Sequence, residues 1–171
     1  MSNLEQYIRT VNDYPKKGIS FKDITTLLKD ANALQLTGKE LFENAKHLQV
    51  DKVIGIESRG FMYGLWLAMQ INAGFVPVRK PNKLPSEVFR QEYQLEYGVD
   101  TLEMHVDAIQ KGDKVLVHDD VLATGGTAEA VSKLVEKAGG EIVQFSFLIE
   151  IPFLNGRSKL DGYEIKSLIQ Y

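Results

Sequence analysis

Residues 115–127 constrain the fold of this chain more than any other stretch. An apolar, mostly β-branched run leads to adjacent carboxylates at Asp119 and Asp120, and Thr-Gly-Gly-Thr then comes directly before a helical pattern. The first turn of a helix presents unpaired backbone N–H groups and partial positive charge, which suit a phosphate. Glycines in such a turn permit close approach and positive φ. The segment therefore predicts a strand, a phosphate-binding turn and a helix.

The side chains of this segment suit a sugar phosphate. Ionised carboxylates accept hydrogen bonds from ribose hydroxyls, and the hydroxyls of Thr124 and Thr127 can donate to a phosphate. The segment lacks the Gly-Lys-Ser/Thr of a Walker A loop and is not a Gly-x-Gly-x-x-Gly fingerprint. The alternative is a tight turn carrying two solvated acids, and the strand–glycine–helix order favours the phosphate site.

Predicted strands alternate with predicted helices along the chain. The strands centre on Val53, Val76, Val115 and Ile142, and the main helices cover residues 31–48, 61–70 and 127–138. Such alternation implies right-handed crossovers and an α/β fold with a central, mostly parallel twisted sheet flanked by helices. Ligands bind beyond the carboxyl ends of such strands, so residues 57–60 and 119–127 can line the same cleft.

The length of 171 residues favours one domain over residues 1–171. We expect a small N-terminal hood over about residues 1–28, beginning with a helix through Leu4, Ile8 and Val11. We also expect a flexible lid loop over about residues 80–98, whose last part pairs with residues 101–106 as a hairpin. The helix at 61–70 is apolar nearly all round, which predicts burial on several sides and a subunit interface.

Composition narrows the functional classes. A net charge of −3, from 20 basic and 23 acidic residues, argues against a nucleic-acid partner. The absence of cysteine excludes disulfides, zinc held by cysteine and a thiol nucleophile. The N-terminus lacks a signal-peptide pattern, and no apolar run approaches the roughly 20 residues of a membrane span. We therefore expect a cytoplasmic protein without a membrane partner.

Residues 115–127 resemble the loop that binds phosphoribosyl pyrophosphate (PRPP) in the type I phosphoribosyltransferases. The resemblance covers essentially the whole chain, including residues 148–150, 156–160 and 167–171 near the C-terminus. It implies that the acidic pair binds the ribose hydroxyls and that residues 123–127 bind the 5′-phosphate. The residues implied to bind PRPP or AMP are Ser58, Arg79, Lys83, Tyr97, Asp119, Asp120, Ala123, Thr124, Gly125, Gly126 and Thr127.

Residues 57–60, Glu-Ser-Arg-Gly, resemble the pyrophosphate loop of that family, which often contains a cis peptide. Arg59 offers a fork of donors that matches phosphate oxygens, and the resemblance implies a catalytic role for it. Residues 79–85 form a basic loop, which is expected to provide positive charge for the pyrophosphate leaving group. Arg79 is expected to reach the site of a neighbouring subunit. Taken alone, each stretch also fits a solvated surface loop.

Two further stretches resemble the members of the family that use adenine. In residues 94–98, the resemblance makes Glu96 a catalytic residue that interacts with the purine near N7, as a general acid. In residues 13–25, it implies that Phe21 stacks on adenine. The other implied adenine contacts are Ile19, Lys22 and Leu122. Lys22 stands where arginine is usual, and Phe21 taken alone also fits a core position.

The implied reaction joins adenine to PRPP and gives AMP and pyrophosphate. Mg²⁺ is expected on the pyrophosphate and ribose oxygens of the substrate, without direct protein ligands, and the expected assembly is a homodimer. Ala123 lacks the acid that 6-oxopurine enzymes carry at this place, which disfavours guanine and hypoxanthine. The alternatives are a phosphoribosyltransferase for another purine or pyrimidine, and a regulator that senses PRPP without catalysis. His118 is expected to have no chemical role.

Overall fold

A computed structural model of the protein describes residues 3–94 and 98–171. The chain divides into two compact units, Met1–Glu40 and Leu41–Tyr171. The first unit carries a small antiparallel ribbon, and the second carries a larger parallel sheet. The expectation of a single domain with a hood over residues 1–28 stays a prediction.

The N-terminal unit is built on the antiparallel ribbon. The 3₁₀ helix η1 (Leu4–Tyr7) precedes β1 (Arg9–Asn12), which pairs with β2 (Ser20–Asp23), and α1 (Thr25–Leu28) and the start of α2 (Ala31–Ala45) follow. The predicted helix through Val11 is therefore wrong beyond its first turn. The ladder runs from Arg9 opposite Asp23 to Asn12 opposite Ser20, so pairing across a later turn overrides the local helical spacing.

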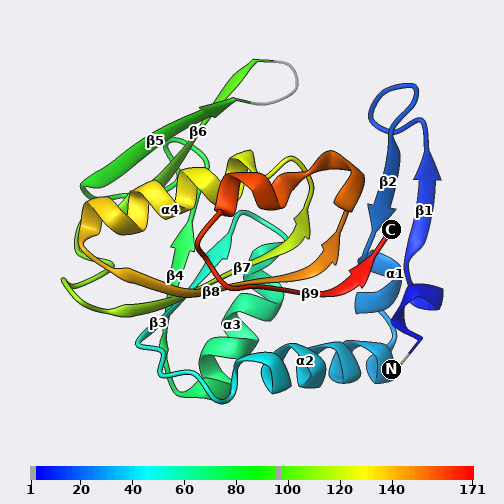
Figure 1. Ribbon diagram of the computed structural model, residues 1–171, viewed down its shortest axis with the longest axis horizontal. Coiled ribbons are helices and arrows are strands. Elements are labelled where there is room, and N and C mark those ends of the chain that lie inside the picture. The colour runs from blue at the N-terminus through cyan, green and yellow to red at the C-terminus, as the bar shows by residue number, and fades with distance from the viewer. Residues whose placement is uncertain (1–2, 95–97) are drawn as a thin grey trace. The chain divides into compact units, whose positions relative to one another are not determined.

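The C-terminal unit contains a five-stranded sheet in which all neighbours are parallel (Figure 1). In sheet order the strands are β4 (Gly74–Val78), β3 (Lys52–Ile56), β7 (Lys114–Leu122), β8 (Glu141–Glu150) and β9 (Ile165–Gln170). Short β-branched runs such as residues 115–117 are fully buried, as expected for strands covered on both faces. The predicted fold class is confirmed.

Two helices cover the sheet. α3 (Gly60–Ile71) connects β3 to β4, and α4 (Gly126–Ala138) connects β7 to β8. The two crossovers leave neighbouring strands in opposite directions, so the helices lie on opposite faces, as Figure 1 shows. The strand order therefore reverses between β3 and β7, and the carboxyl ends of these two strands form the topological switch point, where ligands bind in open α/β sheets.

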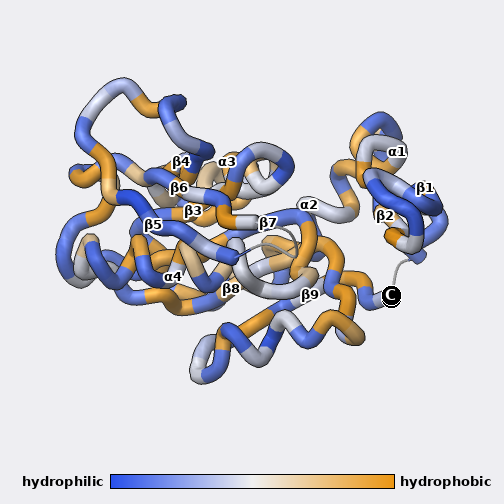
Figure 2. Tube along the Cα trace, turned by 90° about the horizontal axis from the view of Figure 1, so that it is seen from above, coloured by the Kyte–Doolittle hydropathy of each residue, from blue (hydrophilic) through white to orange (hydrophobic). Residues whose placement is uncertain are grey.

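A hairpin of β5 (Val88–Gln94) and β6 (Val99–His105) packs on α4. β5 begins earlier than the predicted hairpin arm, because Phe89 and Tyr93 reach the apolar core beneath it. Leu102 and Met104 of β6 belong to the same core and are fully buried. In Figure 2, β5 is mostly blue, while α4 alternates between orange and blue, as an amphipathic helix does.

α3 buries Tyr63, Leu67 and Ala68 within this chain, whereas the exposed fractions of Met62, Leu65 and Met69 are 47%, 49% and 71%. The predicted subunit interface on this helix stays a prediction. One expectation about a strand needs correction: the strand predicted around Val115 does not end before the acidic pair but continues, as β7, to Leu122, since its ladder with β8 extends to Glu150. The acidic pair therefore lies within the strand.

Among the described residues, no helix has the length and apolar character that a membrane crossing needs.

His118 gives a testable pH dependence. The ring is fully buried in β7, with Nδ1 3.3 Å from Oγ of Ser146 and in a T-shaped contact with the ring of Tyr63. Burial lowers the pKa of His118 to about 3. The unfolded chain binds this proton near pH 6.5, so the contribution of the neutral ring to stability is complete above pH 6.5 and is lost as the pH falls toward 3.

Replacing His118 with leucine is expected to reduce the loss of unfolding free energy between pH 7 and pH 4.5 by roughly 2–3 kcal/mol. Urea denaturation at the two pH values measures this difference, and catalytic activity at pH 7 is expected to persist. His47→Gln is the matched control, because it removes an exposed histidine and leaves the buried ring of His118 in place. An unaltered pH dependence in His118→Leu would contradict the prediction.

Candidate active site

The loop after β3 meets the end of β7 at Gly60, the first residue of α3. A Cβ on Gly60 would lie 2.8 Å from the carbonyl oxygen of His118 and 3.0 Å from Oδ1 of Asp119. Both distances are shorter than ordinary van der Waals separations, so only glycine allows this approach. The structure thereby brings residues 57–60 and the acidic pair together, although they lie far apart in the sequence.

Arg59 and Asp120 directly link the loop after β3 to the end of β7. Nε of Arg59 lies 2.9 Å from Oδ2 of Asp120, and the side chains are 32% and 6% exposed. Oδ2 receives no well-aligned hydrogen bond, so the contact is one of opposite charges. The residue predicted to bind pyrophosphate is thus paired with a residue predicted to bind ribose.

The acidic pair has unusual electrostatics. Burial raises the pKa of Asp119 well above its usual value, and the charge of Asp120 adds to this effect. Burial also raises the pKa of Asp120, although Arg59 opposes the shift. The backbone N–H of Asp120 donates to Oδ1 of Asp119 at 2.9 Å, which orients that carboxylate. Two desolvated carboxylates at a sheet edge are suited to hydroxyl groups or to a cation.

The predicted phosphate loop has the geometry that its glycines suggested. Gly125 has φ +78°, precedes α4 as its N-cap residue, and accepts a hydrogen bond from the backbone N–H of Glu129 at 2.9 Å. Gly125 and Gly126 are buried, whereas Ala123, Thr124 and Thr127 are partly accessible. The backbone N–H groups of the first helical turn therefore open at the carboxyl end of β7.

Glu57 ties the basic loop to the loop after β3. Its carboxylate accepts hydrogen bonds from Nζ of Lys83 at 2.5 Å, the backbone N–H of Lys80 at 2.8 Å and Nε of Arg79 at 3.2 Å. Although burial pushes the pKa of Glu57 upward, these three donors outweigh it and hold the pKa below its usual value. The Glu57–Ser58 peptide is cis, as the resemblance implied.

Glu57 was not among the predicted site residues. Its donors stand 22 to 26 positions away, so no local pattern indicates the cluster. The available signal was the position of an acid between a strand and the Ser-Arg-Gly turn. Arg79 and Lys83, both predicted to contact pyrophosphate, are positioned together by this buried carboxylate. Arg79 also lies over the ring of Phe61, at 5.8 Å from the centroid.

The predicted adenine-binding residues lie in separate parts of the structure. In the N-terminal unit, Phe21 of β2 is half-buried and makes an edge contact with Tyr14 at 5.2 Å between centroids, and Nζ of Lys22 donates to Thr10 at 3.0 Å. Ile19 is also half-buried. In the C-terminal unit, Leu122 is 2% exposed and belongs to the core, so its adenine contact stays a prediction.

Two predicted lid residues, Glu96 and Tyr97, lie outside the described residues. The strand that leads to them is described up to Gln94, whose carbonyl oxygen would lie 3.0 Å from a Cβ on Gly126. Lys80 ties the start of the lid to this hairpin, because its Nζ donates to the hydroxyl of Tyr93 at 2.7 Å and to Asp100. The hairpin therefore lies against the amino end of α4.

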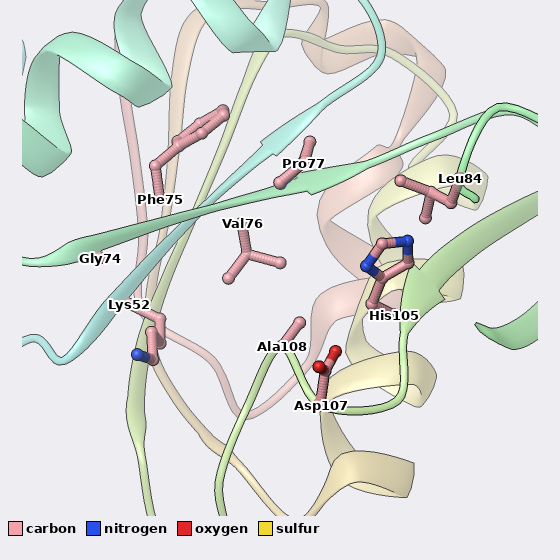
Figure 3. Close-up of a pocket in the computed structure, with 9 residues that line it drawn as sticks. All are labelled: Lys52, Gly74, Phe75, Val76, Pro77, Leu84, His105, Asp107 and Ala108. Carbon is pink, nitrogen blue, oxygen red and sulfur yellow. The ribbon is translucent and has the colours of Figure 1, made fainter. Parts of the chain in front are cut away.

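A cavity of about 240 Å³ lies elsewhere, beside the edge strand β4 (Figure 3). Figure 3 shows Leu84 and His105 on one side of it, facing Val76 and Pro77 of the strand. Its lining contains none of the predicted site residues, and the phosphate loop and acidic pair lie at the carboxyl ends of other strands. The chemistry of charged and glycine-rich loops identifies the site better than this cavity does.

The chain is similar to known proteins over nearly all of its length. The phosphoribosyl transferase domain model matches residues 16–167. The chain is 58% identical to the adenine phosphoribosyltransferase of Christiangramia forsetii over 168 residues, with 98% of both chains covered. It is 56% identical to that of Flavobacterium johnsoniae, covering 98% of this chain and 99% of the relative. The crystal structure of adenine phosphoribosyltransferase from Thermoanaerobacter pseudethanolicus matches with a TM-score of 0.96 and 50% identity, with 98% of both chains covered.

Proposed function

Because the chain belongs to the adenine phosphoribosyltransferases, within the phosphoribosyl transferase domain family, we propose a division of its site between PRPP and adenine. The protein is a transferase of purine salvage: it joins adenine to the phosphoribosyl group of PRPP and releases AMP and pyrophosphate. The observation that carries the proposal is the contact between Arg59 and Asp120 at the topological switch point of the sheet.

PRPP lies across the ends of β3 and β7 in this proposal. Asp119 and Asp120 accept hydrogen bonds from the ribose hydroxyls, and residues 123–127 bind the 5′-phosphate through backbone N–H groups and the threonine hydroxyls. The pyrophosphate takes the basic side of the site, with Ser58, Arg59 and Lys83, and in the proposed dimer Arg79 acts on the pyrophosphate of the neighbouring subunit. The proximity of Gly60 to Asp119 supports this arrangement, because it keeps the ribose and pyrophosphate ends of the site adjacent.

In this proposal Phe21 stacks on the adenine ring, and Ile19, Lys22 and Leu122 are the other residues that contact adenine. Ala123 leaves no carboxylate near the base, which disfavours 6-oxopurines. Glu96 lies near purine N7 in this proposal, where its carboxyl group accepts the proton that adenine loses as AMP forms and returns it, as a general acid, to the departing purine in the reverse reaction, and Tyr97 binds PRPP or AMP. The adenine ring is thus bound by residues outside the phosphate loop.

Catalysis depends on charge and placement. The sugar carbon becomes oxocarbenium-like as pyrophosphate leaves, and Arg59 with the basic loop stabilises the negative charge that develops on the leaving group. Glu57 keeps Arg79 and Lys83 in place before pyrophosphate arrives, so little reorganisation is needed. Closure of the lid excludes water and limits hydrolysis of PRPP.

Mg²⁺ is proposed to enter with PRPP, on the pyrophosphate and ribose oxygens. The residues present fit a cation carried by the substrate, because the adjacent carboxylates of Asp119 and Asp120 place negative charge beside the ribose oxygens that would hold it. A divalent cation beside them would favour their charged forms and neutralise charge on the leaving group. Residues 3–94 and 98–171 contain no group of three or more His, Asp or Glu side chains that could hold a metal ion.

The proposed assembly is a homodimer that uses the exposed face of α3. Met62, Leu65 and Met69 form an apolar stripe on this helix, and such stripes mark protein interfaces.

A cytoplasmic location is part of the proposal, because PRPP is highly charged and does not cross a bilayer unaided. The enzyme would therefore act where PRPP is made.

The test is the formation of AMP from radiolabelled adenine with PRPP and Mg²⁺. We expect AMP and pyrophosphate in equal amounts with adenine, and little product with guanine or orotate. Equal use of guanine or orotate would support a phosphoribosyltransferase for another base. PRPP binding without any product would support the regulator that senses PRPP, and no binding at all would reject the proposed site.

A further inference from the structure

The C-terminal pattern that the sequence shares with the family has a structural counterpart beside the phosphate loop. The 3₁₀ helix η3 (Gly156–Leu160) begins with a glycine in direct contact with that loop. A Cβ on Gly156 would overlap the carbonyl oxygen of Ala123 and would lie 3.0 Å from the backbone nitrogen of Gly125. It would also lie 3.0 Å from Cδ1 of Leu122.

Space, rather than backbone conformation, accounts for glycine at position 156. Its φ lies outside the left-handed region, so an alanine could adopt the backbone without strain. The contact is also reciprocal, because a Cβ on Gly125 would overlap the carbonyl oxygen of Gly156 and would lie 3.1 Å from its carbonyl carbon. The two glycines therefore allow the backbone of η3 to lie directly against the phosphate loop.

A buried carboxylate holds this turn in place. Glu150, at the end of β8, is 3% exposed and accepts hydrogen bonds from Nε and Nη2 of Arg157 at 2.6 and 2.7 Å. Its carboxylate also accepts from Oγ of Ser167 at 2.5 Å and from Nε2 of Gln170 at 3.3 Å, both in β9. The Arg157 guanidinium is the main reason that the pKa of Glu150 lies below its usual value.

Glu150 is fixed relative to the strand that carries the phosphate loop. It lies opposite Leu122 in the β7–β8 ladder, and the backbone N–H of Ile151 donates to the carbonyl of Leu122 at 2.9 Å. The bidentate pair with Arg157 thus sets the position of Gly156 against the sheet edge. Bidentate arginine–carboxylate pairs fix orientation as well as distance.

We propose that η3 is a floor for the 5′-phosphate loop, and that Gly156, held through Arg157 and Glu150, positions the N–H groups that bind the phosphate. The inference rests on the proposed binding of the 5′-phosphate by residues 123–127. Two consecutive glycines give that loop many alternative conformations, and a rigid surface beneath it removes most of them. A misplacement of about 1 Å in such a site is costly.

Gly156→Ala tests directly whether η3 positions the phosphate loop. We expect it to weaken binding of AMP and ribose 5-phosphate roughly 10–100-fold, while binding of adenosine, which lacks the phosphate, stays unchanged. Isothermal titration calorimetry measures all three. Gly162→Ala is the matched control: a Cβ there meets nothing within 4 Å, although φ is +87°, so it imposes backbone strain without touching the loop. We expect its AMP affinity to stay within about threefold of the unaltered protein.

Arg157 provides a second route if Gly156→Ala does not fold. Arg157→Lys keeps a positive charge beside Glu150 but loses the bidentate geometry, so we expect a selective loss for AMP and ribose 5-phosphate and a smaller one than in Arg157→Met. Adding Glu150→Gln to Arg157→Met should restore the melting temperature without restoring phosphate affinity, because it removes the buried unpaired charge but not the missing anchor.

Two outcomes would overturn the inference: phosphate affinities that stay unchanged in Gly156→Ala and Arg157→Lys, or losses that are equal for AMP and adenosine, which indicate general distortion. Failure of the unaltered protein to bind ribose 5-phosphate is a different result. It would reject the proposed function of residues 123–127, and the inference would fall with it.

Discussion

Gly60→Ala is expected to lower kcat/KM roughly a hundredfold, because the new methyl group would push the loop of residues 57–60 away from the acidic pair of β7. Its Cβ would lie 2.8 Å from the carbonyl oxygen of His118, which belongs to the ladder of β7 and cannot rotate away. The start of α3 must shift instead, and Arg59 shifts with it. Steady-state kinetics with PRPP as the varied substrate measures the effect.

Gly64→Ala is the matched control for this prediction. Gly64 lies one turn further along α3, where a Cβ would be 3.2 Å from Cα of Gly55 and 3.2 Å from the ring of Phe75. Both variants are expected to lose roughly 1–3 kcal/mol of unfolding free energy through overpacking. Only Gly60→Ala should lose most of its activity, and equal activity losses in the two variants would contradict the assignment of Gly60 to the site.

Arg59→Met is expected to reduce kcat by roughly 10²–10³, the range for removing one preorganised donor from a transition state. It also leaves Asp120, whose side chain is 6% exposed, without its positive partner. Because Arg59 is a third exposed, we expect a stability loss of about 1–3 kcal/mol, less than for a fully buried pair. Single-turnover kinetics and urea denaturation measure the two effects separately.

The double variant Arg59→Met with Asp120→Asn separates the effect of Arg59 on stability, through the charge of Asp120, from its effect on turnover. Removing the unpaired carboxylate should recover most of the lost stability and none of the turnover. Lowering the pH should narrow the stability difference between Arg59→Met and the unaltered protein measured at the same pH, because protonation of Asp120, whose pKa is already raised, removes the buried charge. Recovery of turnover in the double variant would show that Arg59 acts through Asp120 rather than on pyrophosphate.

The local order of residues was enough to predict the elements that carry the site. The apolar run, the acidic pair and the two glycines predicted β7, the turn at Gly125 and α4, because each depends on neighbours within a few positions. Alternation of strands and helices predicted the parallel sheet. The main errors fell where pairing with distant residues overrides local spacing, as in β1 and in the earlier start of β5.

The sequence by itself determined the strand–turn–helix unit, the parallel sheet, and the residue types that suit a sugar phosphate. Only the tertiary structure decided which groups meet: Arg59 with Asp120, Glu57 with Arg79 and Lys83, and Gly156 with the phosphate loop. The physical reason is that these contacts join segments tens of residues apart, and their distances depend on the packing of the sheet edge. Local patterns specify the donors and acceptors, and packing sets the partners to which they bind.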